Sequence, residues 1–180
     1  MSNTIERQGY RYIPGPFQYS AGVAALPGHA IERVRFTDPV PLADGFRRIE
    51  AYLAAEGLPL TAFCACELRS PGQFTDAGFV AFNRHYVGTL ERWGIVENDR
   101  NPVARSNVCP ELGAPAVPSF HAFCLVRPAD AAPRSFVCAG SGEARESTGP
   151  TARRRCVMAR PRRTRWPKRR ASSSARWNGG

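Results

Sequence analysis

The chain has 180 residues and a mass of 19.8 kDa, a length that suits one domain with a modest hydrophobic core. Its 43% hydrophobic residues are ordinary for a globular protein, and no apolar run approaches the roughly 18 residues that a membrane-spanning helix needs. The formal net charge is +10, but residues 141–180 hold 12 of the 25 basic residues and only two acidic ones, so residues 1–140 are neutral overall. These numbers exclude a role in the membrane and confine any attraction for nucleic acid to the C-terminal stretch.

The N-terminus and the cysteines indicate the cellular compartment. Residues 1–8 are polar and contain no apolar segment typical of a secretory signal. The six cysteines follow no secreted disulfide framework, and Cys64 and Cys66 lack a second Cys or His pair at zinc-type spacing. We therefore expect reduced thiols in a cytoplasmic protein that holds neither a metal nor a cofactor.

The first half of the chain predicts strands and then a helix. Residues 17–23 predict a strand, which ends at the turn 26–28, and residues 31–36 predict its antiparallel partner. From residue 42 the apolar residues recur with a helical period, which predicts a helix that ends at Gly57. Its apolar stripe consists of Leu42, Phe46, Ile49 and Leu53.

The second half continues this alternation. Residues 62–68 predict a strand, and a second helix follows, with Thr75 as N-cap and Gly94 at its end. The apolar stripe of this helix consists of Phe79, Phe82, Tyr86, Leu90 and Trp93. Further strands are predicted at residues 103–108, 119–126 and 135–140.

This order of elements predicts an α+β fold with one sheet and two helices. Two helices cover only one face of such a sheet, so we expect self-association to bury the other face. The expected organisation is a domain at residues 1–130, an additional strand within 131–143 and a basic tail at 144–180.

The basic tail allows two interpretations. From the Leu, Ile, Val, Phe and Met set, residues 141–180 contain only Val157 and Met158, so this stretch is predicted to be disordered. Its arginine runs and its two tryptophans are compatible with binding to nucleic acid or with a nuclear import signal. Its richness in Arg, Ala, Pro, Ser and Gly instead favours the hypothesis of a frameshift near residues 141–150. Nucleic acid is a partner only if the tail is authentic.

Three segments of the chain, taken together in their order and spacing, resemble one known family. They are residues 15–22 (GPFQYSAG), the helix segment that starts at residue 82 (FNRHYV), and residues 101–108 (NPVARSNV). Over roughly residues 10–127 the chain resembles the Rid (YjgF-type) family of imine and enamine deaminases. The resemblance implies a chorismate-mutase-like fold with a single sheet and two helices on one face. It also implies a homotrimer with ligand clefts between subunits and hydrolytic deamination of a small carboxylate-bearing imine or enamine.

Arg105 is the first predicted substrate-binding residue. A guanidinium presents a planar fork of donors that matches a carboxylate, and in the family the arginine at this place holds the substrate carboxylate. An arginine on an edge strand more often forms an ordinary surface ion pair. The Ala-Arg-Ser context favours the ligand-binding role.

The last predicted strand departs from the family pattern. Family members hold the attacking water with a glutamate there, whereas residues 119–123 of this chain contain no acid. Ser119 occupies the expected position, and His121 lies two residues later on the same face. An imidazole titrates near neutral pH, so Ser119 and His121 are the predicted catalytic residues. The alternative for His121 is a half-buried histidine bonded to a backbone carbonyl.

Four further residues complete the predicted cleft. Asn107 stands where many family members carry cysteine, while Tyr19, Ser20 and Gly22 are predicted to line the cleft from a neighbouring strand. For Tyr19, packing in a core or an interface is an equal alternative. The missing glutamate also leaves open a non-catalytic metabolite-binding or regulatory protein of the same fold. Nucleic-acid binding through the tail is the third hypothesis.

Overall fold

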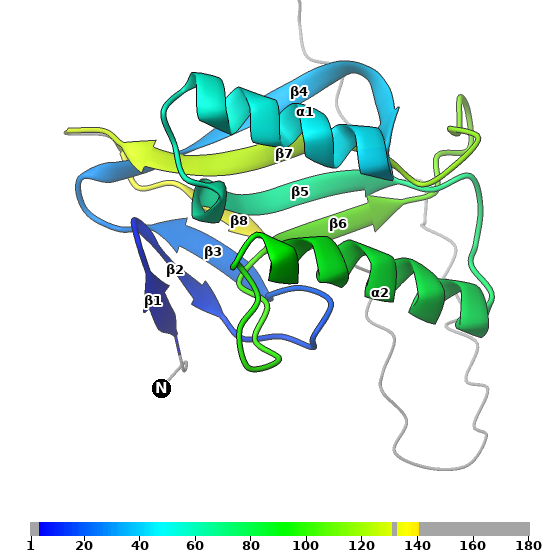
Figure 1. Ribbon diagram of the computed structural model, residues 1–180, viewed down its shortest axis with the longest axis horizontal. Coiled ribbons are helices and arrows are strands. Elements are labelled where there is room, and N and C mark those ends of the chain that lie inside the picture. Colours follow the sequence, from blue (N-terminus) through cyan, green and yellow to red (C-terminus); the bar gives the residue numbers. More distant parts are fainter. Residues whose placement is uncertain (1–3, 131–132, 141–180) are drawn as a thin grey trace, which may run out of the picture. The chain divides into compact units, whose positions relative to one another are not determined.

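The computed structural model describes residues 4–130 and 133–140, which form eight strands and two α-helices (Figure 1). In chain order the elements are β1 (Ile5–Arg7), β2 (Tyr10–Ile13), β3 (Gly22–Ala25), β4 (His29–Pro41), α1 (Leu42–Ala55), a 3₁₀ turn (Leu60–Ala62), β5 (Phe63–Arg69), α2 (Asp76–Arg92), β6 (Ala104–Val108), β7 (Ser119–Pro128) and β8 (Phe136–Cys138). The basic tail and the frameshift hypothesis lie outside the described residues. The domain boundaries given above stay predictions.

The strands form two hydrogen-bonded sets of four. One set has the order β4-β7-β5-β6, with β5 and β6 parallel, and the other is antiparallel with the order β1-β2-β3-β8. A parallel bridge between Ser20 and Ala104 joins them. The predicted α+β class is confirmed. The sequence predicted a single sheet, whereas the structure has two. They are separated because residues 16–19 form a turn, so that a single bridge connects β6 to the segment before β3.

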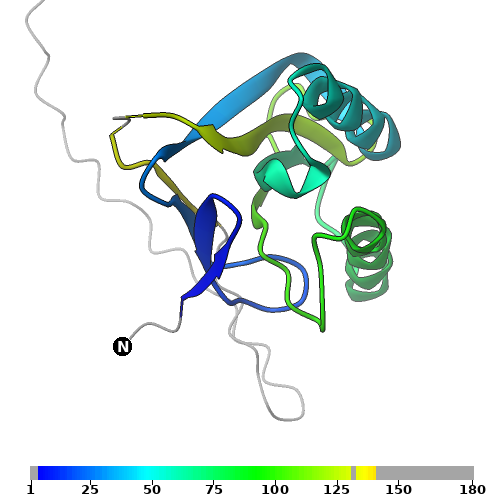
Figure 2. The ribbon, with the colours of Figure 1, turned by 60° about the vertical axis from the view of Figure 1, so that its left-hand side comes forward.

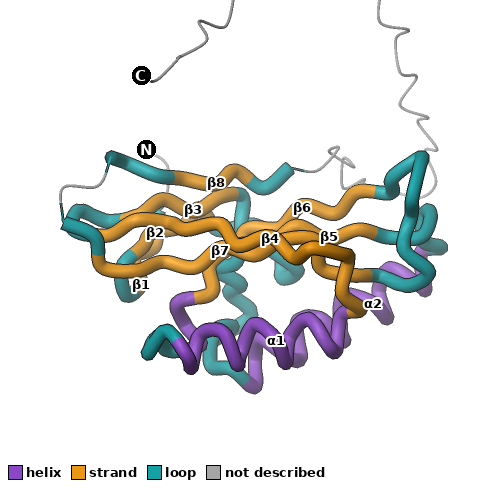
Figure 3. The backbone as a smooth tube through the Cα atoms, turned by 90° about the horizontal axis from the view of Figure 1, so that it is seen from above, coloured by secondary structure: helices purple, strands orange, loops and turns teal. Residues whose placement is uncertain are grey.

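Both helices lie on the same side of the strands (Figure 3) and run side by side, seen nearly end-on in Figure 2. The predicted apolar stripe of α1 is buried along its whole length. Phe46 is its central residue, with ring centroids 5.0 Å from Phe120 on β7 and 5.2 Å from Trp93 at the end of α2. Gly57 follows α1 with a φ of +65°, a left-handed conformation that favours glycine.

Helix α2 begins and ends where the sequence predicts. The Thr75 hydroxyl accepts a hydrogen bond of 3.1 Å from the backbone N–H of Gly78, and Gly94 follows the helix with a φ of +67°. The buried face of α2 carries Asn83 between Phe82 and Tyr86, and both Asn83 and the Tyr86 hydroxyl form hydrogen bonds to side chains of the sheet. The predicted stripe residue Phe79 is 38% exposed.

The predicted pairing of the first two strands is wrong. Strand β4 pairs with β7, whereas β3 pairs with β2 and β8. The hairpin β1–β2 was not predicted, because its strands have only three and four residues, too few for the alternation of Tyr10, Arg11 and Tyr12 to indicate a strand. Strand β4 also continues through Asp38 and Pro39. The pairing of β4 with β7 is interrupted by a register shift between Arg35 and Val40, so the missing N–H of the proline breaks no hydrogen bond of the sheet.

The described residues contain no helix that is long and apolar enough to cross a membrane. The five cysteines in this part of the chain are free thiols. Burial raises the pKa of Cys66 to about 12 and that of Cys124 to about 11. Both thiols are therefore protonated at neutral pH and act as small apolar groups in the core.

Candidate functional site

Arg105 lies on β6 with its side chain on the helix-covered side of the sheet. Its pairing partner on β5 is Cys66, whose thiol shares a hydrogen bond of 3.3 Å with the Tyr86 hydroxyl of α2. Paired residues of neighbouring strands point to the same face, so both side chains point toward α2. Arg105 is only 4% exposed, which is rare for a charged residue.

Three aromatic rings surround the guanidinium of Arg105. Its Cζ lies 4.8 Å from the centroid of Tyr86, 5.4 Å from that of Tyr19 and 5.5 Å from that of Phe82. Cation–π attraction replaces part of the hydration that the buried guanidinium has lost. Burial raises the pKa of Tyr86 well above its ordinary value, so its hydroxyl stays neutral. The surroundings of this cation are therefore aromatic and uncharged.

Asn83 is the polar partner of Arg105. The guanidinium Nη2 donates a hydrogen bond of 2.7 Å to Asn83 Oδ1, while Asn83 Nδ2 donates one of 2.8 Å to the carbonyl of Phe79. The other terminal nitrogen, Nη1, is buried and has no hydrogen-bond partner, and no carboxylate among residues 4–130 and 133–140 pairs with Arg105. A buried cation with a free donor is destabilised unless an anion completes its bonding. This arrangement is suited to receive a carboxylate.

The turn that precedes β3 forms the neighbouring wall of this site. The Ser20 N–H donates a hydrogen bond of 2.8 Å to the carbonyl of Val103. Asn101 connects the turn to the segment before β6. Its Nδ2 donates a hydrogen bond of 3.1 Å to the carbonyl of Phe17, and its Oδ1 accepts one of 3.0 Å from the Val103 N–H. These bonds fasten the turn along the start of β6 and place Tyr19 against the guanidinium.

Two side chains of this turn carry polar atoms without partners. Ser20 Oγ and Gln18 Oε1 are both buried and form no hydrogen bond with the part of the chain that the structure describes. Together with Arg105 Nη1 they place three such atoms in the turn and in the strand to which it is bonded. Ser20 is paired with Ala104, the neighbour of Arg105 on β6, so the Ser20 hydroxyl and the Arg105 guanidinium point to opposite faces of the strands.

Asn107 and Gly22 are placed differently from the residues of this turn. Asn107 follows Arg105 on the same face of β6, and its Oδ1 accepts a hydrogen bond of 2.9 Å from Ser70 Oγ. Gly22 begins β3 opposite Cys138 of β8, where a Cβ would lie 3.0 Å from the carbonyl oxygen of Val137. This close approach of two backbones gives Gly22 a packing role against β8.

The predicted catalytic residues lie on the other face of the sheet. Phe120 packs its ring on Phe46 of α1, so its neighbour Ser119 points away from the helices. The register shifts after Phe120, but His121 lies on the same outer face, where the charges of Arg69 and Glu67 act on it. The Ser119 hydroxyl donates a hydrogen bond of 2.8 Å to the carbonyl of Val117. One protomer therefore does not bring Ser119 and His121 to the guanidinium of Arg105.

The surroundings of His121 are charged and mostly basic. An ion pair between Arg33 and Glu67 lies on this face, with Nε 2.5 Å from Oε1, and this bond keeps the pKa of Glu67 below its usual value. Burial, followed by the positive charge of Arg69, lowers the pKa of His121 from its ordinary value of 6.5. The imidazole is therefore neutral at pH 7 and can accept a proton.

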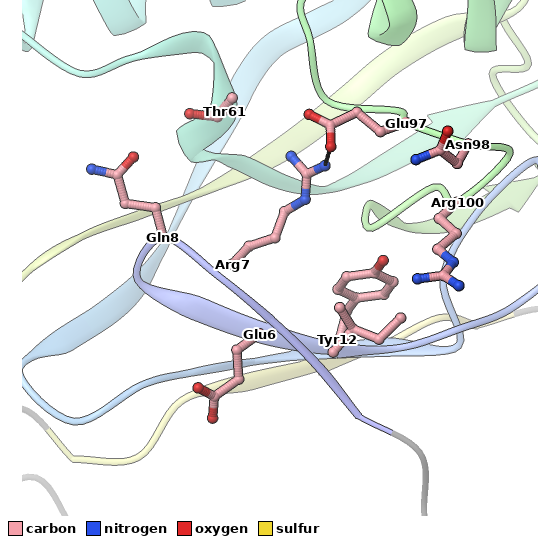
Figure 4. A pocket seen from close by; sticks show the side chains of 9 residues that line it. Glu6, Arg7, Gln8, Tyr12, Thr61, Glu97, Asn98 and Arg100 are labelled. Carbon is pink, nitrogen blue, oxygen red and sulfur yellow. Dashed lines mark ion pairs between the residues drawn. The ribbon is translucent and has the colours of Figure 1, made fainter.

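The cavities of the protomer do not coincide with the aromatic surroundings of Arg105. A cavity of about 390 Å³ lies between the β1–β2 hairpin and residues 97–100 (Figure 4), and there Arg7 is neutralised by Glu97 at 3.3 Å. A second cavity of about 300 Å³ lies between β8 and the sheet face that carries the Arg33–Glu67 pair, and Arg105 also contributes to its wall. Arg105 is the better candidate for ligand binding because its charge is unpaired, whereas the first cavity holds its own ion pair.

Comparison with known proteins decides the family. The family model described as 2-aminomuconate deaminase CnbZ matches residues 2–162. The chain belongs to the CnbZ family. A Comamonas testosteroni protein named 2-amino-5-chloromuconate deaminase is 56% identical over 144 residues, which cover 79% of this chain and 57% of that protein. The chain thus spans little more than half the length of this curated relative, and no solved structure matches it.

Membership of the CnbZ family is consistent with the resemblance to Rid-type deaminases and so supports it. Sequence reasoning singled out Arg105 in this CnbZ family member but missed Asn83. A signal for Asn83 was present, since Asn83 and Tyr86 stand three residues apart on one helix face. The described residues contain no cluster of His, Cys, Asp and Glu that could hold a metal ion.

Proposed function

We propose that this protein is a deaminase that hydrolyses a carboxylate-bearing enamine or imine to a 2-oxo compound and ammonia. The observation that carries the proposal is the buried guanidinium of Arg105, for which residues 4–130 and 133–140 supply neither a partner at Nη1 nor a neutralising acid. A substrate carboxylate would supply both the missing acceptor and the missing negative charge. Membership of a family described as deaminases supports the same reaction class.

The substrate class follows from the family and from its curated relative. Their names describe a six-carbon unsaturated dicarboxylate with an amino group on the carbon next to one carboxylate. We propose an α-amino or α-imino acid of this kind as the substrate. Arg105 would hold the carboxylate that adjoins the nitrogen, so that the reacting carbon lies within the aromatic walls of the site.

The reaction balances with water as the co-reactant. Protonation of the enamine carbon converts the C–NH₂ group to an iminium, and the oxygen of water then forms a bond to the former C=N carbon. One proton of the added water moves to nitrogen, the C–N bond breaks with ammonia as the leaving group, and the other proton leaves the oxygen, which becomes the carbonyl oxygen. Hydrolysis of this kind needs no redox partner, so we propose that the protein acts without a cofactor.

We further propose that the working site combines two copies of the chain. Arg105 and His121 point to opposite faces of one protomer, so a site that uses both needs a second copy to contribute its His121. The neutral imidazole would accept a proton from the attacking water, with Ser119 beside it. The expected assembly is a homotrimer in the cytoplasm, in which Tyr19, Ser20, Gly22 and Asn107 belong to the Arg105 side of the cleft.

Ammonia release tests the proposed reaction. The wild-type protein, Arg105→Ala and His121→Ala are compared on 2-iminopropanoate generated in situ and on 2-aminomuconate. Arg105→Ala should lower kcat/KM about 10- to 150-fold, because the charge-assisted hydrogen bond from Nη1 to a carboxylate contributes roughly 1.5–3 kcal/mol. Arg48→Ala, at an exposed position of α1, serves as the matched control. Unchanged turnover in Arg105→Ala would place the site elsewhere.

A further inference from the structure

The guanidinium of Arg105 is enclosed in the structure, although the proposed substrate must reach it. Arg105 is 4% exposed and its Nη1 is buried. Neither of the two cavities described above is lined by the rings of Tyr19, Phe82 or Tyr86 that surround the guanidinium. A carboxylate can therefore form a hydrogen bond with Nη1 only after one of these aromatic walls has moved.

The three walls differ in how firmly they are held. Tyr86 and Phe82 belong to α2 and are part of the hydrophobic core, so moving either ring would disrupt the core. Tyr19 is only half-buried and lies in the turn of residues 16–19. That turn is attached to the β6 side by the hydrogen bond from Asn101 and by the single bridge at Ser20. The turn is therefore the wall that opens at the lowest cost in free energy.

The turn can move as a unit because it is also held together by contacts of its own. The Tyr19 N–H donates a hydrogen bond of 3.2 Å to the carbonyl of Pro16. A Cβ at Gly15 would lie 2.5 Å from the Tyr19 carbonyl oxygen, so the two ends of the turn are packed closely against each other. Opening leaves these internal contacts intact and breaks only the hydrogen bonds across to Asn101 and Val103.

We propose that the turn of residues 16–19 is a gate to Arg105 and that the Asn101 side chain is its latch, an inference that rests on the function proposed above. Asn101 is 3% exposed, and its amide bonds both to the carbonyl of Phe17 and to the N–H of Val103. When the bond to Phe17 breaks, the turn carries Tyr19 away from the guanidinium, and a carboxylate enters beside Nη1. When it re-forms, the ring closes over the ligand. Asn101 is thus a positioning residue that acts through Tyr19.

The kinetics of binding reveal such a latch, because it stabilises the closed turn equally with and without ligand. Weakening the latch increases the fraction of time during which the turn is open. Association and dissociation then become faster by the same factor, and the dissociation constant stays nearly unchanged while the closed state predominates. A residue that only supports the fold would instead weaken binding without speeding association.

Amide hydrogen exchange of the full chain measures the gate without any ligand. The test variant is Asn101→Ser, whose hydroxyl can still accept from the N–H two residues later but cannot reach the Phe17 carbonyl. Loss of one hydrogen bond should speed exchange of the Ser20 N–H about two- to tenfold and leave the Tyr86 N–H on α2 unchanged. The control Asn98→Gly changes an exposed asparagine of the same segment, at a φ of +51° that glycine tolerates, and should alter neither rate.

Stopped-flow binding of muconate, an ultraviolet-absorbing six-carbon dicarboxylate without nitrogen, measures the effect of the gate on a ligand. Asn101→Ser should raise the association and dissociation rate constants about two- to tenfold each and leave the dissociation constant within about twofold of the wild-type value. Tyr19→Ala removes the ring that covers the guanidinium and should also speed association. Adding Asn101→Ser to Tyr19→Ala should then have no further effect, because the two residues act through one gate.

The outcomes separate the gate from the proposed function. Unchanged exchange of Ser20 together with unchanged association in Asn101→Ser overturns the inference, and so does weaker binding with a lowered melting temperature and no faster association. If Asn101→Ser does not fold, failure of Tyr19→Ala to speed association refutes the gate. If the wild type binds no muconate and releases no ammonia, the proposed function fails, while the exchange rates still decide whether the turn opens.

Discussion

The amide oxygen of Asn83 lies 2.7 Å from Nη2 of Arg105 and engages one of its two terminal nitrogens, which leaves the other without a partner. An asparagine, unlike an aspartate, orients a guanidinium without neutralising it. The hydrogen bond from Asn83 to the Phe79 carbonyl fixes the amide in turn, so helix α2 determines where the guanidinium lies. The positive charge of Arg105 therefore remains available to a ligand.

The first prediction concerns this neutrality. Asn83→Asp keeps the shape of the side chain but supplies an internal carboxylate that pairs with Arg105 and competes with the substrate. We expect KM to rise at least about tenfold, with a smaller change in kcat, because one charge-assisted interaction is lost from substrate binding. Steady-state ammonia release measures both constants. The control is His85→Asp, which adds a negative charge at an exposed position of α2. If His85→Asp raises KM as much as Asn83→Asp does, the effect comes from long-range electrostatics and not from pairing with Arg105.

The second prediction concerns the sharing of the site between copies. Arg105→Ala and His121→Ala are each expected to be inactive when expressed alone. Co-expressed in equal amounts, they should form mixed trimers in which about one quarter of the sites combine an intact Arg105 with an intact His121. Recovery of roughly this fraction of wild-type activity would show that the two residues act from different chains. If the mixture stays inactive while each variant is folded, the shared site is wrong.

The third prediction concerns pH. Because burial and Arg69 lower the pKa of His121 from 6.5, the imidazole is neutral above that value and takes up a proton only at lower pH. The kcat/KM of the wild type should therefore stay constant above pH 6.5 and fall as the pH decreases below it. His121→Gln should lose most of its activity together with this acidic limb. The exposed His85, changed to Gln, should leave the profile intact, and an acidic limb that persists in His121→Gln would assign the titration to another group.

The fourth prediction concerns the packing of α1 on β7. A Cβ at Gly45 would lie 2.2 Å from the Phe120 ring, and Phe120 is fully buried. Gly45→Ala should therefore lower the free energy of unfolding by about 1–3 kcal/mol in spite of the better helix propensity of alanine. Gly88→Ala on α2 has open space around the new Cβ and should raise the free energy of unfolding by roughly 0.5–1 kcal/mol. Thermal and denaturant unfolding measure both changes, and equal effects of the two substitutions would contradict the packing described for Gly45.

The helices and the central strands were predictable because local signals determine them. The periodic stripe that begins at Leu42, the N-cap Thr75 and the terminal glycines Gly57 and Gly94 each act within a few residues. Strand pairing was predicted less well, since it depends on contacts between distant segments. The partner of β3 illustrates this, because Gly22 pairs with Cys138, more than a hundred residues away.

The candidate site was predictable to the same limited extent. Arg105 was recognisable from the Ala-Arg-Ser context, but its burial among Tyr19, Phe82 and Tyr86 depends on the packing of α2 and of the turn before β3. The opposite orientations of Arg105 and His121 likewise follow from the sheet and from no local pattern. The roles of Ser119 and His121 in catalysis stay predictions.

The unpaired charge of Arg105 offers a way to find ligands without knowing the reaction. Any anion that reaches Nη1 binds the folded chain and not the unfolded one, so at a fixed concentration a tighter-binding anion raises the melting temperature further. A panel of organic acids that vary in chain length and α-substituent can therefore be ranked by differential scanning fluorimetry alone. Arg105→Gln would provide the background for each compound.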